Sequence, residues 1–216
     1  MATPDTPRSA LVAGATGLIG HELLPMLLAS PRRTQVHALL RRAVTGLPSD
    51  PRLQVHTVDF QSLPALPPVD DVFIALGTTI KIAGSQAAFR AVDFDAVVNT
   101  ARAARAAGAT RLGIVSALGA NARSRIFYSR VKGEMQEAVA ALGYASVVIV
   151  QPSMLVGDRD TLGQPLRSGE VWSARFLGWL PRSVKPIPAA QVAKTLLREV
   201  DRGEPGVRLL PSGQLW

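Results

Sequence analysis

The sequence predicts an α/β fold in which a doubly wound parallel sheet is covered by helices on both faces. Three observations predict it: short and almost continuously apolar strands, amphipathic segments that alternate with them, and a glycine-rich turn after the first strand. Strands that are buried on both faces have this apolar character, and their alternation with helices is typical of parallel sheets. The 216 residues are enough for one sizeable core, so we expect a single domain over residues 1–216.

The expected strands and helices follow each other in a regular order. Apolar runs predict strands at residues 9–13, 35–40, 53–58, 71–76, 110–116 and 145–151, with a weaker strand at 206–210. Helical periodicity is clearest at residues 18–29, 86–107, 129–142 and 189–200. The connections 42–52 and 61–70 are rich in proline, and we expect little or no helix in them.

Three glycines, Gly14, Gly17 and Gly20, separate the first strand from the first helix. In a dinucleotide-binding turn the first glycine permits a sharp bend, the second lets the backbone approach a pyrophosphate, and the third lets the helix pack on the sheet. The helix N-terminus then presents unpaired N–H groups to phosphate. This pattern predicts a Rossmann-type cofactor site formed by Gly14, Thr16, Gly17, Leu18, Ile19 and Gly20. Its spacing, GxxGxxG, is one residue longer than GxGxxG, and a tight turn without a ligand is the alternative.

The second strand ends in Arg41 and Arg42, where an acidic residue would bind the ribose 2′-hydroxyl of NAD. The next acidic residue is Asp50. Guanidinium groups bind phosphate through paired, charge-assisted hydrogen bonds, so we expect NADP as the cofactor, with NAD less favoured. The alternative is that the two arginines only solvate a loop.

Residues after the third and fourth strands complete the expected cofactor site. Asp59 and Phe60 follow the third strand, where a carboxylate and a ring can lie beside the adenine. Leu76 ends the fourth strand, and Gly77 and Thr78 follow it, so that a small and a hydroxyl-bearing residue stand where the cofactor must pass the strand ends.

Tyr128 and Lys132 are four residues apart, so on a helix they share one face. A nearby ammonium favours the ionised phenol, which makes the tyrosine a usable proton donor and acceptor. Ser116 ends the fifth strand and can offer a hydroxyl to a substrate oxygen. We therefore expect Ser116, Tyr128 and Lys132 to form the catalytic group.

Several segments together resemble the short-chain dehydrogenase/reductase superfamily: GATGLIG at 14–20, ALGTTIKIAGS at 75–85, VDFDAVVNTARAARAAG at 92–108, IVSALGA at 114–120, YSRVKGEMQ at 128–136 and QPSMLVGDR at 151–159. Within it, the chain is most similar to short, atypical members with the extended-type glycine motif, including the TIP30-like group. The resemblance covers roughly residues 9–195.

The resemblance implies a role for each matching residue. The three glycines bind the pyrophosphate, and Arg41 and Arg42 select NADP. Ser116 orients the substrate carbonyl, Tyr128 passes the proton, and Lys132 holds the nicotinamide ribose. Tyr128, Lys132 and Pro152 also belong to the implied cofactor contacts.

The chain departs from the superfamily pattern at three places. Ala117 and Leu118 stand where extended members often have a second hydroxyl. The stretch Gln151-Pro152-Ser153 replaces an RPG-like motif and lacks its arginine. Asp93 stands where many extended members have asparagine. These departures bear on turnover more than on cofactor binding.

The expected function is NADP(H)-dependent hydride transfer to or from a small carbonyl or hydroxyl substrate. The alternatives are a regulatory or interaction protein that binds NADPH without turnover, and an epimerase or dehydratase, which normally needs a larger substrate domain. We place the small substrate region at residues 152–190. Its aromatic residues recur at helical spacing and either roof the nicotinamide pocket or form a packed core or dimer helix: Trp172, Phe176 and Trp179.

Composition argues against several other classes of protein. The chain has no cysteine, which excludes disulfides, thiolate metal sites and cysteine nucleophiles. The net charge of +8 comes from scattered arginines without interleaved aromatics, so we expect no nucleic-acid partner. His21, His37 and His56 are isolated in the sequence, so no metal is expected.

The sequence also carries an expectation about location and partners. No run approaches the roughly 18 apolar residues of a membrane span, and the stretch MATPDTPRS lacks the apolar core of a signal peptide. We therefore expect a soluble, cytoplasmic protein without a membrane partner. Apolar helix faces are compatible with a homodimer.

Overall fold

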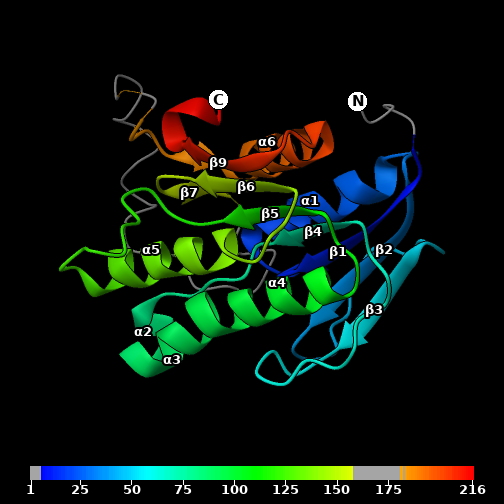
Figure 1. Cartoon of the computed structure of the whole chain (residues 1–216), viewed down its shortest axis with the longest axis horizontal. Coiled ribbons are helices and arrows are strands. Elements are labelled where there is room, and N and C mark those ends of the chain that lie inside the picture. Colours follow the sequence, from blue (N-terminus) through cyan, green and yellow to red (C-terminus); the bar gives the residue numbers. More distant parts are fainter. Residues whose placement is uncertain (1–5, 158–180, 182) are drawn as a thin grey trace.

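Seven parallel strands form the central sheet of the computed structural model, which describes residues 6–157, 181 and 183–216 (Figure 1). Their spatial order is β3-β2-β1-β4-β5-β6-β9, the doubly wound arrangement expected from the sequence. The predicted fold class is therefore confirmed. The strands are β1 (Arg8–Ala13), β2 (Arg33–Leu40), β3 (Leu53–Thr57), β4 (Asp71–Ile74), β5 (Arg111–Val115), β6 (Ser146–Gln151) and β9 (Gly206–Pro211).

Helices cover both faces of this sheet (Figure 1). On one face lie α1 (Leu18–Ala29) and α6 (Ala189–Arg202), and on the other lie α4 (Val97–Ala106) and α5 (Phe127–Ala140). Each face has its own apolar core. Alternate residues of β1 enter opposite cores, Ala10 and Val12 on the α1 side and Leu11 and Ala13 on the α5 side. This two-sided burial explains why the strands are almost continuously apolar.

The helix predicted over 86–107 is divided in the structure. It consists of α3 (Gln86–Arg90), the π-helical segment η1 (Ala91–Ala96) and α4, and it is preceded by the short helix α2 (Ile80–Ala83). The wider turn of η1 departs from the 3.6-residue period, and such turns are frequent at functional sites. A periodicity count cannot detect it, because the apolar residues continue through the segment.

A small second sheet lies after β6. Its strands are β7 (Leu155–Val156) and β8 (Ile187–Pro188), and a short 3-10 helix, η2 (Ser212–Gln214), follows β9. These elements belong partly to the predicted substrate region. Residues 158–180 and 182 lie outside the described part of the chain, and with them Trp172, Phe176 and Trp179.

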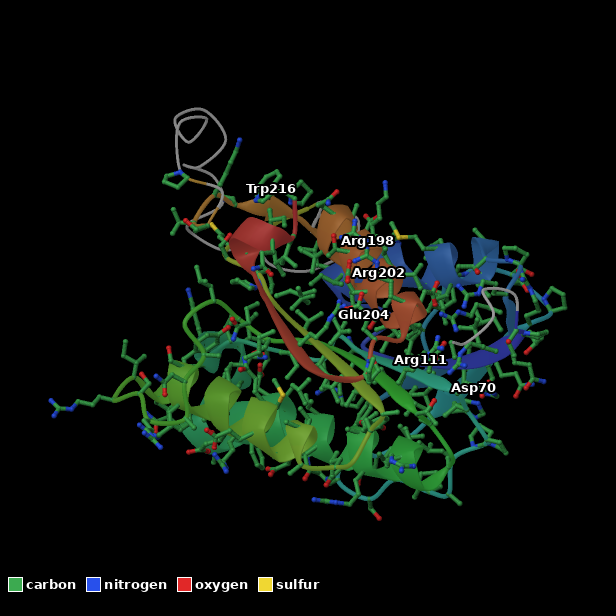
Figure 2. The ribbon with its side chains drawn as sticks, turned by 45° about the horizontal axis from the view of Figure 1, so that its top comes forward. Asp70, Arg111, Arg198, Arg202, Glu204 and Trp216 are labelled. Atoms are coloured by element: carbon green, nitrogen blue, oxygen red, sulfur yellow. The ribbon has the colours of Figure 1, made fainter. Side chains whose placement is uncertain are left out.

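The edge of the sheet where its strands begin is held by buried ion pairs. The Arg33 side chain is fully buried and pairs with both Asp71 and Asp201. Arg8 also binds Asp71, with 2.6 Å between Nη2 and Oδ1. Figure 2 shows Asp70 and Arg111 at the same end of the molecule. At this end of the sheet the charged side chains form structural ion pairs. The predicted cofactor and catalytic residues lie at the opposite end, where the strands finish.

Two of the histidines, which are isolated from each other in the sequence, meet on adjacent strands of the sheet. His37 on β2 and His56 on β3 lie 3.0 Å apart between Nδ1 and Nε2. The parallel pairing of β2 with β3 brings them together. His37 is buried, and burial lowers its pKa, with a smaller contribution from neighbouring His56.

The lowered pKa of His37 predicts a loss of stability in acid. In the unfolded chain histidine titrates near its ordinary value of about 6.5, so as the pH falls the unfolded state takes up this proton first. Stability is therefore full above about pH 6.5 and declines as the pH drops through the folded-state pKa. A His37→Gln variant is expected to lose less in Tm than the wild type between about pH 7 and about pH 5. The exposed His21→Gln serves as control, and equal losses in His37→Gln and wild type would contradict the prediction.

Candidate functional site

The glycine turn is built for a close backbone approach. Gly14 has a positive φ of 92°, and a Cβ there would lie 2.6 Å from the carbonyl oxygen of Ala75. A Cβ on Gly20 would lie 2.0 Å from the carbonyl oxygen of Gly14. Gly17 caps α1 and has no side chain to occupy the first N–H groups of the helix. The turn therefore has the close backbone packing that the sequence predicted, with Thr16 exposed beside it, and its binding of phosphate stays a prediction.

Arg41 and Arg42 are exposed and follow β2 at the same edge of the sheet. The parallel pairing of β1 with β2, Ala13 opposite Leu39, places both arginines near the level of the glycine turn. The next acidic residue, Asp50, is bound to Arg52, with 2.8 Å between Oδ2 and Nη2. This side chain lies just before β3 begins, at the other edge of the sheet, so it is not placed to accept a ribose hydroxyl.

Asp59 and Phe60, expected beside the adenine, have different environments. Asp59 is exposed, and its Oδ1 accepts a hydrogen bond from the Gln61 N–H at 2.9 Å. The Phe60 ring is buried in the core on the α4 side, and the Phe60 carbonyl accepts from Asn99 Nδ2 at 3.2 Å. Asp59 is thus the member of the pair that remains open to a ligand.

Lys132 makes a buried ion pair that the sequence did not reveal. Its Nζ lies 2.7 Å from Oδ1 of Asp93, and both side chains are almost fully buried. The other oxygen of Asp93 accepts from the backbone N–H of Thr78 at 2.8 Å. A Cβ on Gly77 would lie 3.8 Å from Lys132 Nζ. The structure therefore brings three predicted residues, Gly77, Thr78 and Lys132, together around Asp93 at the end of β4.

Tyr128 lies one helical turn before Lys132 on α5 and is half-buried. Its ring packs against Phe89 of α3 at a centroid distance of 5.4 Å. An ion pair between Arg90 and Glu134 also joins α3 to α5. These contacts hold the tyrosine ring against the segment that carries Asp93.

Ser116 follows β5 and is buried. Its Oγ accepts a hydrogen bond from Nε2 of Gln136 at 2.6 Å, and Oε1 of Gln136 accepts from Nε2 of Gln151 at 3.2 Å. Pro152 is buried beside this group, and its carbonyl accepts from the Leu118 N–H at 2.9 Å. Gln136 is absent from the predicted site. Its spacing could have revealed it, because Tyr128, Lys132 and Gln136 recur every four residues on one helix.

Many arginines of this basic chain are paired on the other side of the sheet. Arg198, Arg202 and Glu204 gather along α6 and the turn to β9, away from α5 (Figure 2). They border a hollow of about 530 Å³. The buried Glu199 in its wall pairs with Arg198, Arg202 and Arg208. Burial acts to raise the pKa of Glu199, but these arginines hold it below its ordinary value. Carboxylates already engage the arginines here, and the catalytic candidates lie elsewhere.

Two features are absent from the described residues. None of the helices in this part of the chain is long and apolar enough to cross a membrane. Likewise, the described histidines and carboxylates form no group of three or more that could hold a metal ion.

Comparison with known proteins shows which family model the chain matches and which proteins it resembles. The family model described as NAD(P)H-binding matches residues 14–202. Protein FMP52-1, mitochondrial, of Scheffersomyces stipitis is 32% identical over 196 residues, which cover 86% of this chain and 85% of that protein. Protein fmp52, mitochondrial, of Emericella nidulans is 33% identical over 180 residues, covering 80% and 77%. The expected cytoplasmic location is contradicted by these relatives, which are named as mitochondrial proteins. The narrower likeness to the TIP30-like group stays a prediction.

Solved structures share the fold at low sequence identity. The oxidoreductase ylbE from Lactococcus lactis has a TM-score of 0.65 at 19% identity, covering 95% of this chain and 91% of that chain. MoeE5 in complex with UDP-glucose and NAD has a TM-score of 0.69 at 19% identity, covering 94% and 75%. A UDP-N-acetylglucosamine 4-epimerase from Methanobrevibacter ruminantium has a TM-score of 0.71 at 13% identity, covering 95% and 77%. At these low sequence identities the comparison shows a shared fold and nothing further.

Proposed function

The chain belongs to the NAD(P)H-binding family, and on that premise we propose that it is an NADPH-dependent oxidoreductase acting on a small carbonyl or hydroxyl compound. The observation that supports this proposal best is the position of Ser116, Tyr128 and Lys132. All three lie at or beyond the carboxyl ends of the strands, where ligands bind in folds of this kind. The glycine turn lies at the same edge.

Each residue has a distinct role in the proposed reaction. NADPH supplies the hydride when it is bound. The N–H groups at the start of α1 and the turn around Gly17 hold its pyrophosphate. Lys132, fixed by Asp93, keeps further N–H groups for the ribose hydroxyls. Ser116 donates a hydrogen bond to the substrate oxygen, and the Tyr128 hydroxyl delivers the proton to it.

We propose that Arg41 and Arg42 select NADP by binding its 2′-phosphate. Replacing both with alanine is expected to weaken NADPH binding by about tenfold to hundredfold, because charge-assisted hydrogen bonds to phosphate are lost. Binding of NADH should change little. Titration of the purified variant with each cofactor, followed by tryptophan fluorescence, measures both. The exposed Arg102→Ala on α4 is the matched control, and a parallel loss of NADPH and NADH binding would remove the proposed selection.

The first experiment is a thermal-shift titration of the wild-type protein with NADPH and NADH, followed by a screen of carbonyl substrates. A ligand that binds only the folded state raises the Tm with concentration. A rise with NADPH and consumption of NADPH by a carbonyl substrate support the oxidoreductase. If neither NADPH nor NADH raises the Tm, the proposal is contradicted.

A second candidate function is binding of NADPH without turnover. The ion pair between Asp93 and Lys132 favours it, because a lysine whose charge is compensated has less influence on a neighbouring tyrosine. The two functions separate in the same experiment. A regulatory protein shows the thermal shift with NADPH but consumes none across the substrate screen.

A further inference from the structure

The hydrogen bonds that reach Ser116 form a directed relay of two amides. Gln151 donates from Nε2 to Oε1 of Gln136, and Gln136 donates from Nε2 to Oγ of Ser116. Ser116 and Gln136 are 5% and 8% exposed, whereas Gln151 is partly exposed and Gln136 borders a hollow of about 310 Å³. The relay connects the ends of β5 and β6 to the face of α5 that carries Tyr128 and Lys132.

The direction of the relay decides what the serine can do. A serine hydroxyl has one proton to donate and can accept through its oxygen. Because Oγ accepts from Gln136, the proton stays available for another acceptor. If the Gln136 amide were reversed, its Oε1 would face the serine and accept a hydrogen bond from the hydroxyl. In the arrangement observed, Nε2 of Gln151 requires an acceptor on Gln136, and this requirement opposes the reversal.

We propose that Gln136 and Gln151 are positioning residues that fix the polarity of Ser116, so that its hydroxyl donates to the oxygen of a carbonyl substrate. This inference rests on the proposed oxidoreductase function. It also gives a role to Gln151, which replaces the arginine of the RPG-like motif: glutamine keeps an N–H donor at this position without adding a charge.

Two substitutions at one position test the polarity directly. Gln151→Arg offers only donors and keeps the relay direction, whereas Gln151→Glu offers only acceptors when ionised and turns the Gln136 amide round. With NADPH and an ortho-quinone such as 9,10-phenanthrenequinone, Gln151→Glu is expected to lower kcat about tenfold or more, with the KM for NADPH unchanged. Gln151→Arg is expected to lower it at most about threefold. Activity of Gln151→Glu should recover as the pH falls, because a protonated carboxyl can donate.

If the inference is correct, the effect of the Gln151 substitutions on kcat depends on Ser116. In a Ser116→Ala background both substitutions at Gln151 should change kcat by less than about twofold, because the group they position is gone. Gln54→Glu and Gln54→Arg on the exposed face of β3 control for the charge change. Equal losses in the two Gln151 variants, or a loss from Gln151→Glu that persists without Ser116, would overturn the inference.

A readout without turnover separates this inference from the proposed function. The side-chain amide protons of Gln136, assigned in a proton–nitrogen NMR spectrum by their absence in Gln136→Glu, should move upfield in Ser116→Ala, because their acceptor is lost. An unchanged signal means that the amide faces the other way, and the proposed polarity is then wrong. If the amide protons shift but no carbonyl is reduced, the relay stands and the oxidoreductase proposal fails.

Discussion

Replacement of Tyr128 with phenylalanine is expected to lower kcat for carbonyl reduction by about 10²- to 10⁴-fold, the range typical of a lost general acid. The fold should tolerate the change. The ring keeps its packing against Phe89, and the hydroxyl belongs to a half-buried side chain at the N-terminal end of α5. Binding of NADPH should persist, so this variant should keep the thermal shift with NADPH while its turnover falls. Steady-state kinetics with NADPH and a carbonyl substrate measure the loss.

The other tyrosine of the chain provides a matched control. Tyr144 is buried, and its hydroxyl donates to the Ala101 carbonyl at 2.6 Å, on the side of α4. Burial raises the pKa of Tyr144, so this phenol stays protonated. Tyr144→Phe should cost about 1 kcal/mol of stability and leave kcat unchanged. Full activity in Tyr128→Phe would remove the proposed proton donor.

The substitution Gly20→Ala is expected to destabilise the protein by about 4 kcal/mol or more. The new Cβ would stand 2.0 Å from the carbonyl oxygen of Gly14, a backbone atom that cannot rotate away. Either α1 leaves the sheet or the turn is displaced, and both changes are expected to abolish the proposed phosphate site. Thermal or denaturant unfolding gives the loss of stability, and NADPH titration of any folded fraction gives the loss of binding.

Gly17 supplies the comparison within the same turn. Its φ is −82°, and a Cβ added there would lie 3.3 Å from the carbonyl oxygen of Gly14. This contact is tight but does not overlap. Gly17→Ala should therefore cost about 1 kcal/mol, as expected for alanine at a helix N-cap. Similar stability for the two alanine variants would show that the turn relaxes more easily than its geometry indicates.

The parts of the molecule that depend on local pattern could be predicted from the sequence. The apolar strands, the glycine turn and α1 agree with the structure, and α5 begins within two residues of its predicted start. These features depend on residue types that have one dominant conformational use. Buried strands need apolar side chains on both faces, and a left-handed turn needs glycine.

Most interactions of the site join segments that are distant in the sequence, so local patterns could not reveal them. Asp93 and Lys132 meet because η1 and α5 cover the same face of the sheet, and no spacing in the chain records that contact. His37 and His56 meet through strand register. Gln136 carried a helical spacing, but glutamine on a helix is usually a surface residue, so its burial was not evident.

The contact between Gly14 and Ala75 also orders the events of folding. The bend after β1 is pressed against the end of β4, which pairs with β1 from a point 61 residues further along the chain, Ala10 with Asp71. Parallel pairings of this separation carry a large loop-closure cost and form slowly. The glycine turn, where we propose that phosphate binds, is therefore expected to take its shape only after the two halves of the sheet have joined. A turn whose shape depends on both halves of the sheet is expected to be absent from partly folded chains.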